Sequence, residues 1–166
     1  MSAFDWLKTI EPNIPDYSPE EREAISDFTL LWSLFESRLL NSSANAKAIM
    51  AAAQRWHDDG ALTARPFAGT LAYFRNRYFE KGEPTFRFHH LHLRQNDMPD
   101  LVRDVLSGKP ASIVDECTVV FIVIYRFRNN LFHGVKWAYA IKDQLENFGH
   151  SNAALKRALQ VVGPLT

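Results

Sequence analysis

The chain has 166 residues, of which 46% are hydrophobic and 13% aromatic; this composition excludes an intrinsically disordered protein and predicts a substantial core. Its 19 lysines and arginines balance 19 aspartates and glutamates, which argues against a protein that coats nucleic acid through many phosphate contacts. The balance leaves open an enzyme that holds a few phosphates, and it favours self-association over mutual repulsion.

Cysteine content and hydropathy indicate the compartment. Cys117 is the only cysteine and lies in an apolar run, so we expect a buried thiol and neither a disulfide framework nor a cysteine metal site. The N-terminus lacks a basic flank followed by an apolar segment, and no apolar stretch approaches the roughly 18 residues of a membrane span. We therefore expect a cytoplasmic protein with no membrane association.

Helical periodicity predicts an all-α fold in which residues 1–166 form a single domain. Residues 1–17 are expected to be an arm, with at most a short helical turn, that Phe4 and Trp6 pin to the body. Residues 18–166 are expected to form a bundle of about six helices. Ser18 and Pro19 suit the N-cap and first position of its first helix.

The first bundle helix carries a continuous apolar stripe, in which residues recur at alternating steps of three and four. Leu31 and Leu34 widen the stripe, so we expect this helix to be buried on more than one side. The stripe residues are Ile25, Phe28, Trp32, Phe35 and Leu39.

Three further segments lead to the centre of the chain. A helix is expected over 44–58, and another after an N-cap at Thr63, ended by Gly82 and Pro84. Residues 85–94 are either extended or a loop; an extended chain would place alternate residues on one side. Asn96 or Asp97 then caps a short helix. The alternate residues are Phe86, Phe88, His90 and His92.

A long apolar helix is predicted over 112–132, with Ser112 as its N-cap. Its β-branched run favours a strand locally, but its length, caps and helical neighbours predict a fully buried helix. A connection over 134–141 and a last helix over 142–161 complete the chain. The β-branched residues are Val119, Val120, Ile122, Val123 and Ile124.

The apolar helix ends in the polar sequence Arg128-Asn129-Asn130-Leu131-Phe132-His133-Gly134. Gly134 suits the left-handed residue that closes a helix, which places His133 in the last turn. Asn129 and His133 are four residues apart and share a face, whereas Arg128 lies about 140° round the axis from His133. A shared anion, or a second copy of the helix, would be needed to bring Arg128 and His133 together.

Arginine, asparagine, three further residues and histidine at the end of a long helix resemble the motif of HEPN domains. The resemblance is strongest over 112–159. It implies a metal-independent endoribonuclease without a cofactor, whose two protomers form one composite site through their motif helices. Many members are toxins or phage-defence effectors, so the resemblance also implies RNA as a partner and a possible cognate antitoxin or inhibitor.

The motif residues have the chemistry that metal-free RNA cleavage requires. His133, whose imidazole has an ordinary pKa of about 6.5, can act as base or acid near neutral pH. Arg128 can hold a phosphate with two hydrogen bonds, and Asn129 can orient His133 or donate to a phosphate oxygen. The expected product is a 2′,3′-cyclic phosphate. Asn130 and Gly134 are expected to support the site.

Residues 73–94 form a second candidate site, because five cations and two acids alternate there with aromatic residues. Rings beside cations are typical of single-stranded RNA binding. Arg75, Arg77 and Arg87, together with Arg126, are therefore candidates for RNA contacts, although part of the aromatic pattern also fits core packing. The three histidines at 89, 90 and 92 lack cysteine or carboxylate ligands at a suitable spacing, so no metal site is expected.

Two alternatives remain open. In the first, the protein is a non-catalytic HEPN-like interaction or sensing module, in which Arg128 pairs with a carboxylate such as Glu36 and His133 caps the helix. Glu36 could equally support an active site. The second alternative, a helical nucleic-acid-binding regulator, is disfavoured by the zero net charge and by the lack of a recognisable helix-turn-helix.

Overall fold

The computed structural model describes residues 1–132 and 144–162, and within them the fold is all-α, as predicted. One two-stranded hairpin, β1 (Phe79–Glu80) with β2 (Glu83–Pro84), and a 3₁₀ turn, η1 (Gln95–Asp97), interrupt the helices. The helices are α1 (Ala3–Ile10), α2 (Pro19–Leu39), α3 (Ala46–Asp58), α4 (Ala68–Tyr78), α5 (Phe86–His89), α6 (Pro99–Leu106), α7 (Ile113–Phe132) and α9 (Leu145–Val161).

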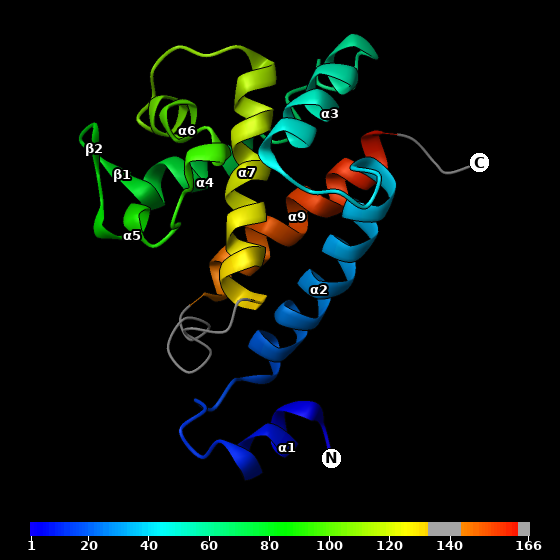
Figure 1. Ribbon diagram of the computed structural model, residues 1–166, viewed down its shortest axis with the longest axis vertical. Helices are drawn as coiled ribbons and strands as arrows, with labels where there is room; N and C mark the ends of the chain where they lie inside the picture. Colours follow the sequence, from blue (N-terminus) through cyan, green and yellow to red (C-terminus); the bar gives the residue numbers. More distant parts are fainter. Residues whose placement is uncertain (133–143, 163–166) are drawn as a thin grey trace.

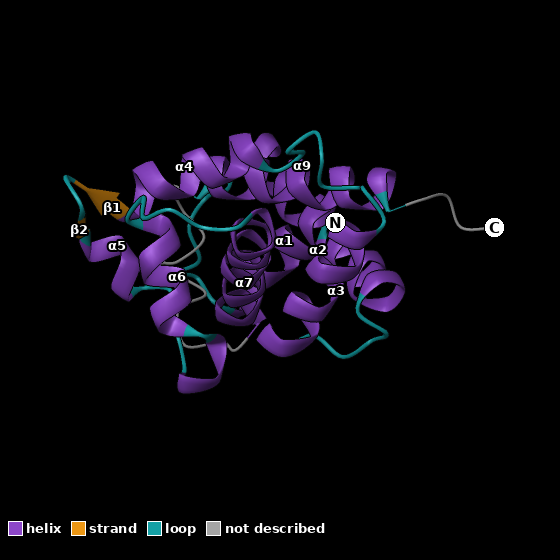
Figure 2. Ribbon diagram, turned by 90° about the horizontal axis from the view of Figure 1, so that it is seen from above, coloured by secondary structure: helices purple, strands orange, loops and turns teal. Residues whose placement is uncertain are grey.

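Helix α7 is the centre of the bundle. Figure 2 looks along α7 and shows the other helices around it, and Figure 1 shows α9 passing behind α7 to meet α2. Ser112 caps α7 as predicted, since its hydroxyl accepts a hydrogen bond of 3.0 Å from the Asp115 amide. The β-branched residues between 119 and 124 are at most 1% exposed, so burial overrides their strand preference.

Aromatic side chains from three segments meet the middle of α7. The ring of Phe121 is fully buried and stacks on Phe35 of α2 at a centroid distance of 4.9 Å. Phe67 and Trp56 contact the same ring edge-on, at 4.9 and 5.6 Å. Offset and edge-on ring pairs add to the free energy gained by burial, so this cluster fixes α2 and α3 against α7.

The N-terminal segment is more regular than expected, because α1 is a helix of eight residues with a capping box between Ser2 and Asp5. Phe4 contacts Tyr17 at 5.5 Å between ring centroids, as a pinning residue should. The same prediction was wrong for Trp6, whose side chain is 53% exposed. Salt bridges from Arg22 to Asp5 and from Lys8 to Asp16 complete the attachment of α1.

Helix α2 begins as predicted, with a capping box between Ser18 and Glu21 and with Pro19 in its first turn. Its stripe faces the core, and Leu31 packs partly buried against it, but the expected burial was wrong for Leu34. Leu34 is 39% exposed and the neighbouring Leu30 is 70% exposed. A single buried face is sufficient because α2 packs on α9, meets α7 through aromatic pairs such as Trp32 with Tyr125, and leaves its outer side to solvent.

Three local predictions need correction. Helix α4 begins at Ala68, and Thr63 lies in the preceding turn, where its hydroxyl donates to the Gly60 carbonyl. The segment after the hairpin is neither extended nor a loop at its start, because α5 turns Phe88 inward and leaves Phe86 67% exposed. Met98, in a left-handed conformation, occupies the cap position of α6 in place of Asn96 or Asp97.

Some predictions concern residues outside the described part of the chain. These are His133, Gly134, the connection over 134–141 and the start of the last helix at residue 142. Within the described residues, α9 begins at Leu145. None of the helices in these residues has the length and apolar character that a membrane span requires.

Candidate functional site

Arg128 lies in the last described turn of α7 and extends its side chain toward α2. Its Nη1 donates a hydrogen bond of 3.0 Å to Oδ1 of Asn129. Its Nη2 lies 3.9 Å from Oε2 of Glu36, and 31% of the Arg128 side chain is exposed. The guanidinium is therefore held in place from two sides while it keeps access to solvent.

Glu36 is itself fixed by two other donors. Trp32 Nε1 donates to Oε2 of Glu36 at 2.9 Å, and the Ala44 amide donates to Oε1 at 3.3 Å. Both of these bonds are shorter than the distance from Glu36 to Arg128. Glu36 therefore connects α2 to the turn before α3, and Arg128 is a further, more distant partner. Glu36 thus holds a negative charge close to the guanidinium without making a close bidentate pair.

Arg126 occupies the opposite side of α7 and is only 3% exposed. Its Nε donates to the Leu91 carbonyl at 3.2 Å, and its Nη1 lies 3.4 Å from Oδ2 of Asp97. Burial lowers the pKa of Arg126, and the Asp97 carboxylate opposes this shift. The RNA contact predicted for Arg126 does not fit this geometry, because its charge is used inside the protein to hold the segment around Leu91.

Asn130 reinforces the contact that Arg126 makes. Its Nδ2 donates to the carbonyls of His90 and Leu91 at 3.1 and 3.2 Å, and its Oδ1 lies 3.5 Å from Nη2 of Arg126. Asn130 thus has a structural role, because its amide ties the segment after α5 to the end of α7, and its support of a catalytic site stays a prediction.

The polar end of α7 thus has two separate faces. Arg128 points to α2, whereas Arg126 and Asn130 are about 200° away round the axis and point to the segment after α5. Asn129 is 6% exposed and lies between them. Residues that are adjacent in the sequence therefore do not form one cleft within the described protomer, and the predicted partner of Asn129, His133, lies outside the described residues.

The arginines of the second candidate site differ in how they are used. Arg75 donates to the Val105 carbonyl at 3.0 Å and lies 3.5 Å from Glu116, so it serves as an internal link between helices. Arg77 reaches Tyr73 and Gln144, and Arg87 lies over the ring of Phe86 at 4.9 Å. The structure thus leaves Arg87 exposed on α5 and Arg77 partly buried near the end of α4, on another side of α4 from Arg75.

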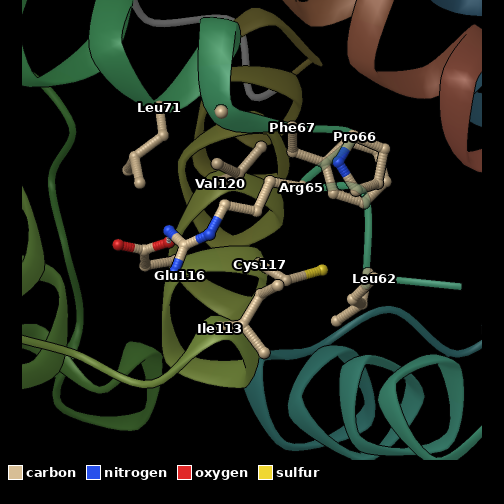
Figure 3. A pocket seen from close by; sticks show the side chains of 10 residues that line it. Leu62, Arg65, Pro66, Phe67, Leu71, Ile113, Glu116, Cys117 and Val120 are labelled. Atoms are coloured by element: carbon tan, nitrogen blue, oxygen red, sulfur yellow. Dashed lines mark hydrogen bonds and ion pairs between the residues drawn. The ribbon is translucent and has the colours of Figure 1, made fainter. Parts of the chain in front are cut away.

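A small pocket lies between the turn before α4 and the first half of α7 (Figure 3). Its volume is about 20 Å³, close to the room that one water molecule needs. Arg65 and Glu116 form a salt bridge of 3.2 Å beside it, and Cys117 lines it. Sequence reasoning missed this pocket because Arg65 and Glu116 are far apart in the chain and belong to no recognisable motif.

Cys117 should be nearly inert to thiol reagents in the folded protein. Its side chain is 3% exposed, and burial raises the pKa of its thiol to about 12. Because the thiolate is the reactive form, labelling by a disulfide reagent at pH 8 should be roughly a thousandfold slower in native protein than in guanidinium chloride. A Ser26→Cys variant, which adds an exposed thiol on α2, should label rapidly; fast labelling of native wild-type protein would contradict the burial of Cys117.

Within residues 1–132 and 144–162, no group of three histidine, cysteine, aspartate or glutamate side chains is arranged to hold a metal ion. The fold and site define a small all-α protein with an arginine–asparagine cluster at the end of its central helix. Comparisons with models of protein families, with curated proteins and with solved structures found no match.

Proposed function

We propose that this protein is a metal-independent endoribonuclease of the HEPN type. The observation that carries the proposal is the position of Arg128: in the last described turn of the central helix, partly exposed, hydrogen-bonded to Asn129 and followed in sequence by His133. This is the arrangement that the resemblance to HEPN domains leads one to expect. Held by Glu36 and Asn129, the guanidinium can bind a phosphate with little further ordering.

The proposed reaction divides three tasks among these residues. His133 takes the proton from the ribose 2′-hydroxyl, and the resulting oxygen attacks the adjacent phosphorus. Arg128 stabilises the negative charge that develops on the phosphate oxygens. A protonated histidine then donates to the 5′-oxygen as its bond to phosphorus breaks, which leaves a 2′,3′-cyclic phosphate. A homodimer formed through the motif helices would supply one histidine from each protomer for the base and acid roles.

The proposal extends to partners and setting. RNA is the substrate, and the protein acts in the cytoplasm as a toxin or phage-defence effector that a cognate antitoxin or inhibitor restrains. The zero net charge agrees with an enzyme that grips a few phosphates and associates with its own copy.

Cleavage in the presence of EDTA tests the proposal directly. Wild-type protein is incubated with single-stranded RNA and, as matched substrate, with the same sequence carrying 2′-O-methyl groups. We expect cleavage of the first alone, with 2′,3′-cyclic phosphate ends detected by mass spectrometry, because the methyl group blocks the attacking oxygen. Cleavage of the methylated RNA, or cleavage that requires added metal, would contradict the mechanism.

A second candidate function is favoured by one specific observation. Arg128 and Arg126 both have a carboxylate partner, Glu36 at 3.9 Å and Asp97 at 3.4 Å, so the cluster could serve the fold alone. The protein would then be a non-catalytic HEPN-like interaction or sensing module. Under this alternative, the wild-type protein cuts none of a panel of RNAs. Under the nuclease proposal, the wild-type protein cuts RNA and Glu36→Gln cuts it more slowly, because Glu36 helps to hold Arg128.

A further inference from the structure

A basic and aromatic surface lies where the C-terminal half of α4 meets α5. We call the surface made by Tyr73, Arg77, Phe86 and Arg87 the α4–α5 surface. Arg77 donates to the Tyr73 hydroxyl at 3.4 Å and to Oε1 of Gln144 at 3.2 Å. Burial raises the pKa of Tyr73, and the charges of Arg77 and Arg87 both act to lower it. The Thr85 hydroxyl, just before α5, donates to the Arg77 carbonyl at 3.0 Å, so the start of α5 lies beside the end of α4.

The two cations of the α4–α5 surface are not balanced by a close acid. Among residues 1–132 and 144–162, neither Arg77 nor Arg87 has a carboxylate within ion-pair distance, unlike Arg75 and Arg126. Within these residues the Glu146 carboxylate acts to raise the pKa of Tyr73, but it forms no ion pair with either arginine. A partly buried guanidinium in such a setting is suited to an anionic ligand.

Phe86 gives this surface an exposed ring. Its side chain is 67% exposed, which is unusual for a phenylalanine in a folded domain. The Arg87 guanidinium covers the ring at 4.9 Å from its centroid, and the His90 ring meets it edge-on at 6.0 Å. A base that stacks on the exposed part of the ring would have a phosphate-binding cation next to it, which is how single strands are held without sequence preference.

The α4–α5 surface is joined to the end of α7. Helix α5 ends at His89, and the next carbonyl, that of His90, accepts a hydrogen bond of 3.1 Å from Asn130. Arg126 holds the Leu91 carbonyl in the same way. Figure 1 shows α5 next to the hairpin, on the side of α7 that faces away from α2. A strand bound on this surface would therefore lie near the end of α7, on the side opposite to Arg128, and would have to pass round that end to reach the Arg128 guanidinium.

We propose that the α4–α5 surface is a binding subsite for single-stranded RNA, with Arg77 and Arg87 on backbone phosphates and an unpaired base stacked on Phe86. The inference rests on the proposed function, because it takes RNA to be the substrate. The exposed ring favours RNA over an acidic protein segment, because a base can stack on the ring whereas an acidic segment would bind the arginines alone. Arg75, tied to Val105 and Glu116, is not part of the subsite.

The test measures binding separately from cleavage. The affinity of the full chain for a fluorescent 2′-O-methyl oligonucleotide is measured by anisotropy at several salt concentrations, so that no strand is cut. Arg87→Ala should weaken binding and reduce the slope of log affinity against log salt by about 0.7, the value for one phosphate contact on a single strand. Phe86→Ala should weaken binding roughly tenfold with an unchanged slope, and Phe86→Tyr should restore it.

Arg55→Ala is the matched control, since Arg55 is exposed on α3 and its loss changes the net charge equally. It should leave affinity and slope unchanged. Wild-type affinity in both Arg87→Ala and Phe86→Ala would overturn the subsite, as would displacement of the RNA by polyglutamate as effectively as by unlabelled RNA. If wild-type protein cuts unmodified RNA but these variants bind normally, only the subsite fails. If binding behaves as expected but unmodified RNA is never cut, the subsite stands and the nuclease proposal fails.

Discussion

Replacing His133 by alanine should reduce RNA cleavage by roughly 10²–10⁴-fold, because the reaction loses its proton-transfer group. Replacing Arg128 by alanine should reduce it by about 10²–10³-fold, because the charge on the phosphate loses its stabilising cation. The double variant should cleave RNA only slightly more slowly than the less active of the two single variants, since the two residues act at the same step. The measurement is kcat/KM on single-stranded RNA in EDTA, with circular dichroism to confirm the fold.

Helix α3 supplies matched controls for these two residues. Arg55 and His57 lie in its last turn and are exposed, so Arg55→Ala and His57→Ala remove the same chemical groups from another helix end. Both controls should retain wild-type cleavage. If His133→Ala cuts RNA at the wild-type rate, the assignment of the motif as catalytic is wrong, and the structural role of the cluster becomes the leading account.

Replacing Arg126 by methionine should lower the free energy of unfolding by about 3–5 kcal/mol. The Arg126 and Asp97 side chains are 4% and 7% exposed, so the substitution leaves the Asp97 carboxylate buried without this cation. It also removes the donor to the Leu91 carbonyl. Urea unfolding followed by circular dichroism measures the change.

A double-mutant cycle identifies the origin of this loss. Asp97→Asn keeps an acceptor for the Arg94 amide, which donates to Asp97 at 2.8 Å, and removes the negative charge. Combined with Arg126→Met, it should be less destabilising than the sum of the two single changes, by about 0.5–3 kcal/mol. Strict additivity, or a loss below about 1 kcal/mol for Arg126→Met alone, would show that the pair contributes little to holding the segment after α5.

Long helices could be predicted from the sequence because their capping residues are local signals and their apolar residues recur over many turns. Ser18 and Ser112 cap α2 and α7 as expected, since a serine before an acid three residues on satisfies free backbone amides wherever the helix packs. The burial of α7 followed from its uninterrupted apolar run. Helix α4 was predicted as an element, although its start was misplaced at Thr63.

Short elements depended on contacts that the sequence does not display. The four residues of α5 are too few for a helical period, and their conformation depends on Phe88 packing on Phe79 at 5.2 Å. Lys81 and Gly82 both have positive φ, which turns β1 into β2 where the sequence indicated only the end of a helix.

The candidate site was predicted as a set of residues and not as an arrangement. Arg126 and Arg128 look equivalent in the sequence, but a step of two residues puts them on opposite sides of a helix. Which of them is buried depends on Asp97 and on the segment around Leu91, which arrive from elsewhere in the chain. The sequence spacing predicted which residues form the motif and what chemistry they offer. Tertiary contacts determine which of its arginines are exposed to solvent.

The contact between Arg128 and Glu36 has a geometric consequence for assembly. Because the Arg128 side chain lies against α2, two protomers can bring their Arg128 side chains to a common phosphodiester only if the C-terminal halves of both α2 helices approach as well. Quaternary contacts would then compress or rearrange the Glu36 carboxylates. The dimerisation affinity and the affinity of Arg128 for a phosphate would thus be thermodynamically linked, so that phosphate binding would change the dimerisation affinity and dimerisation would change the phosphate affinity.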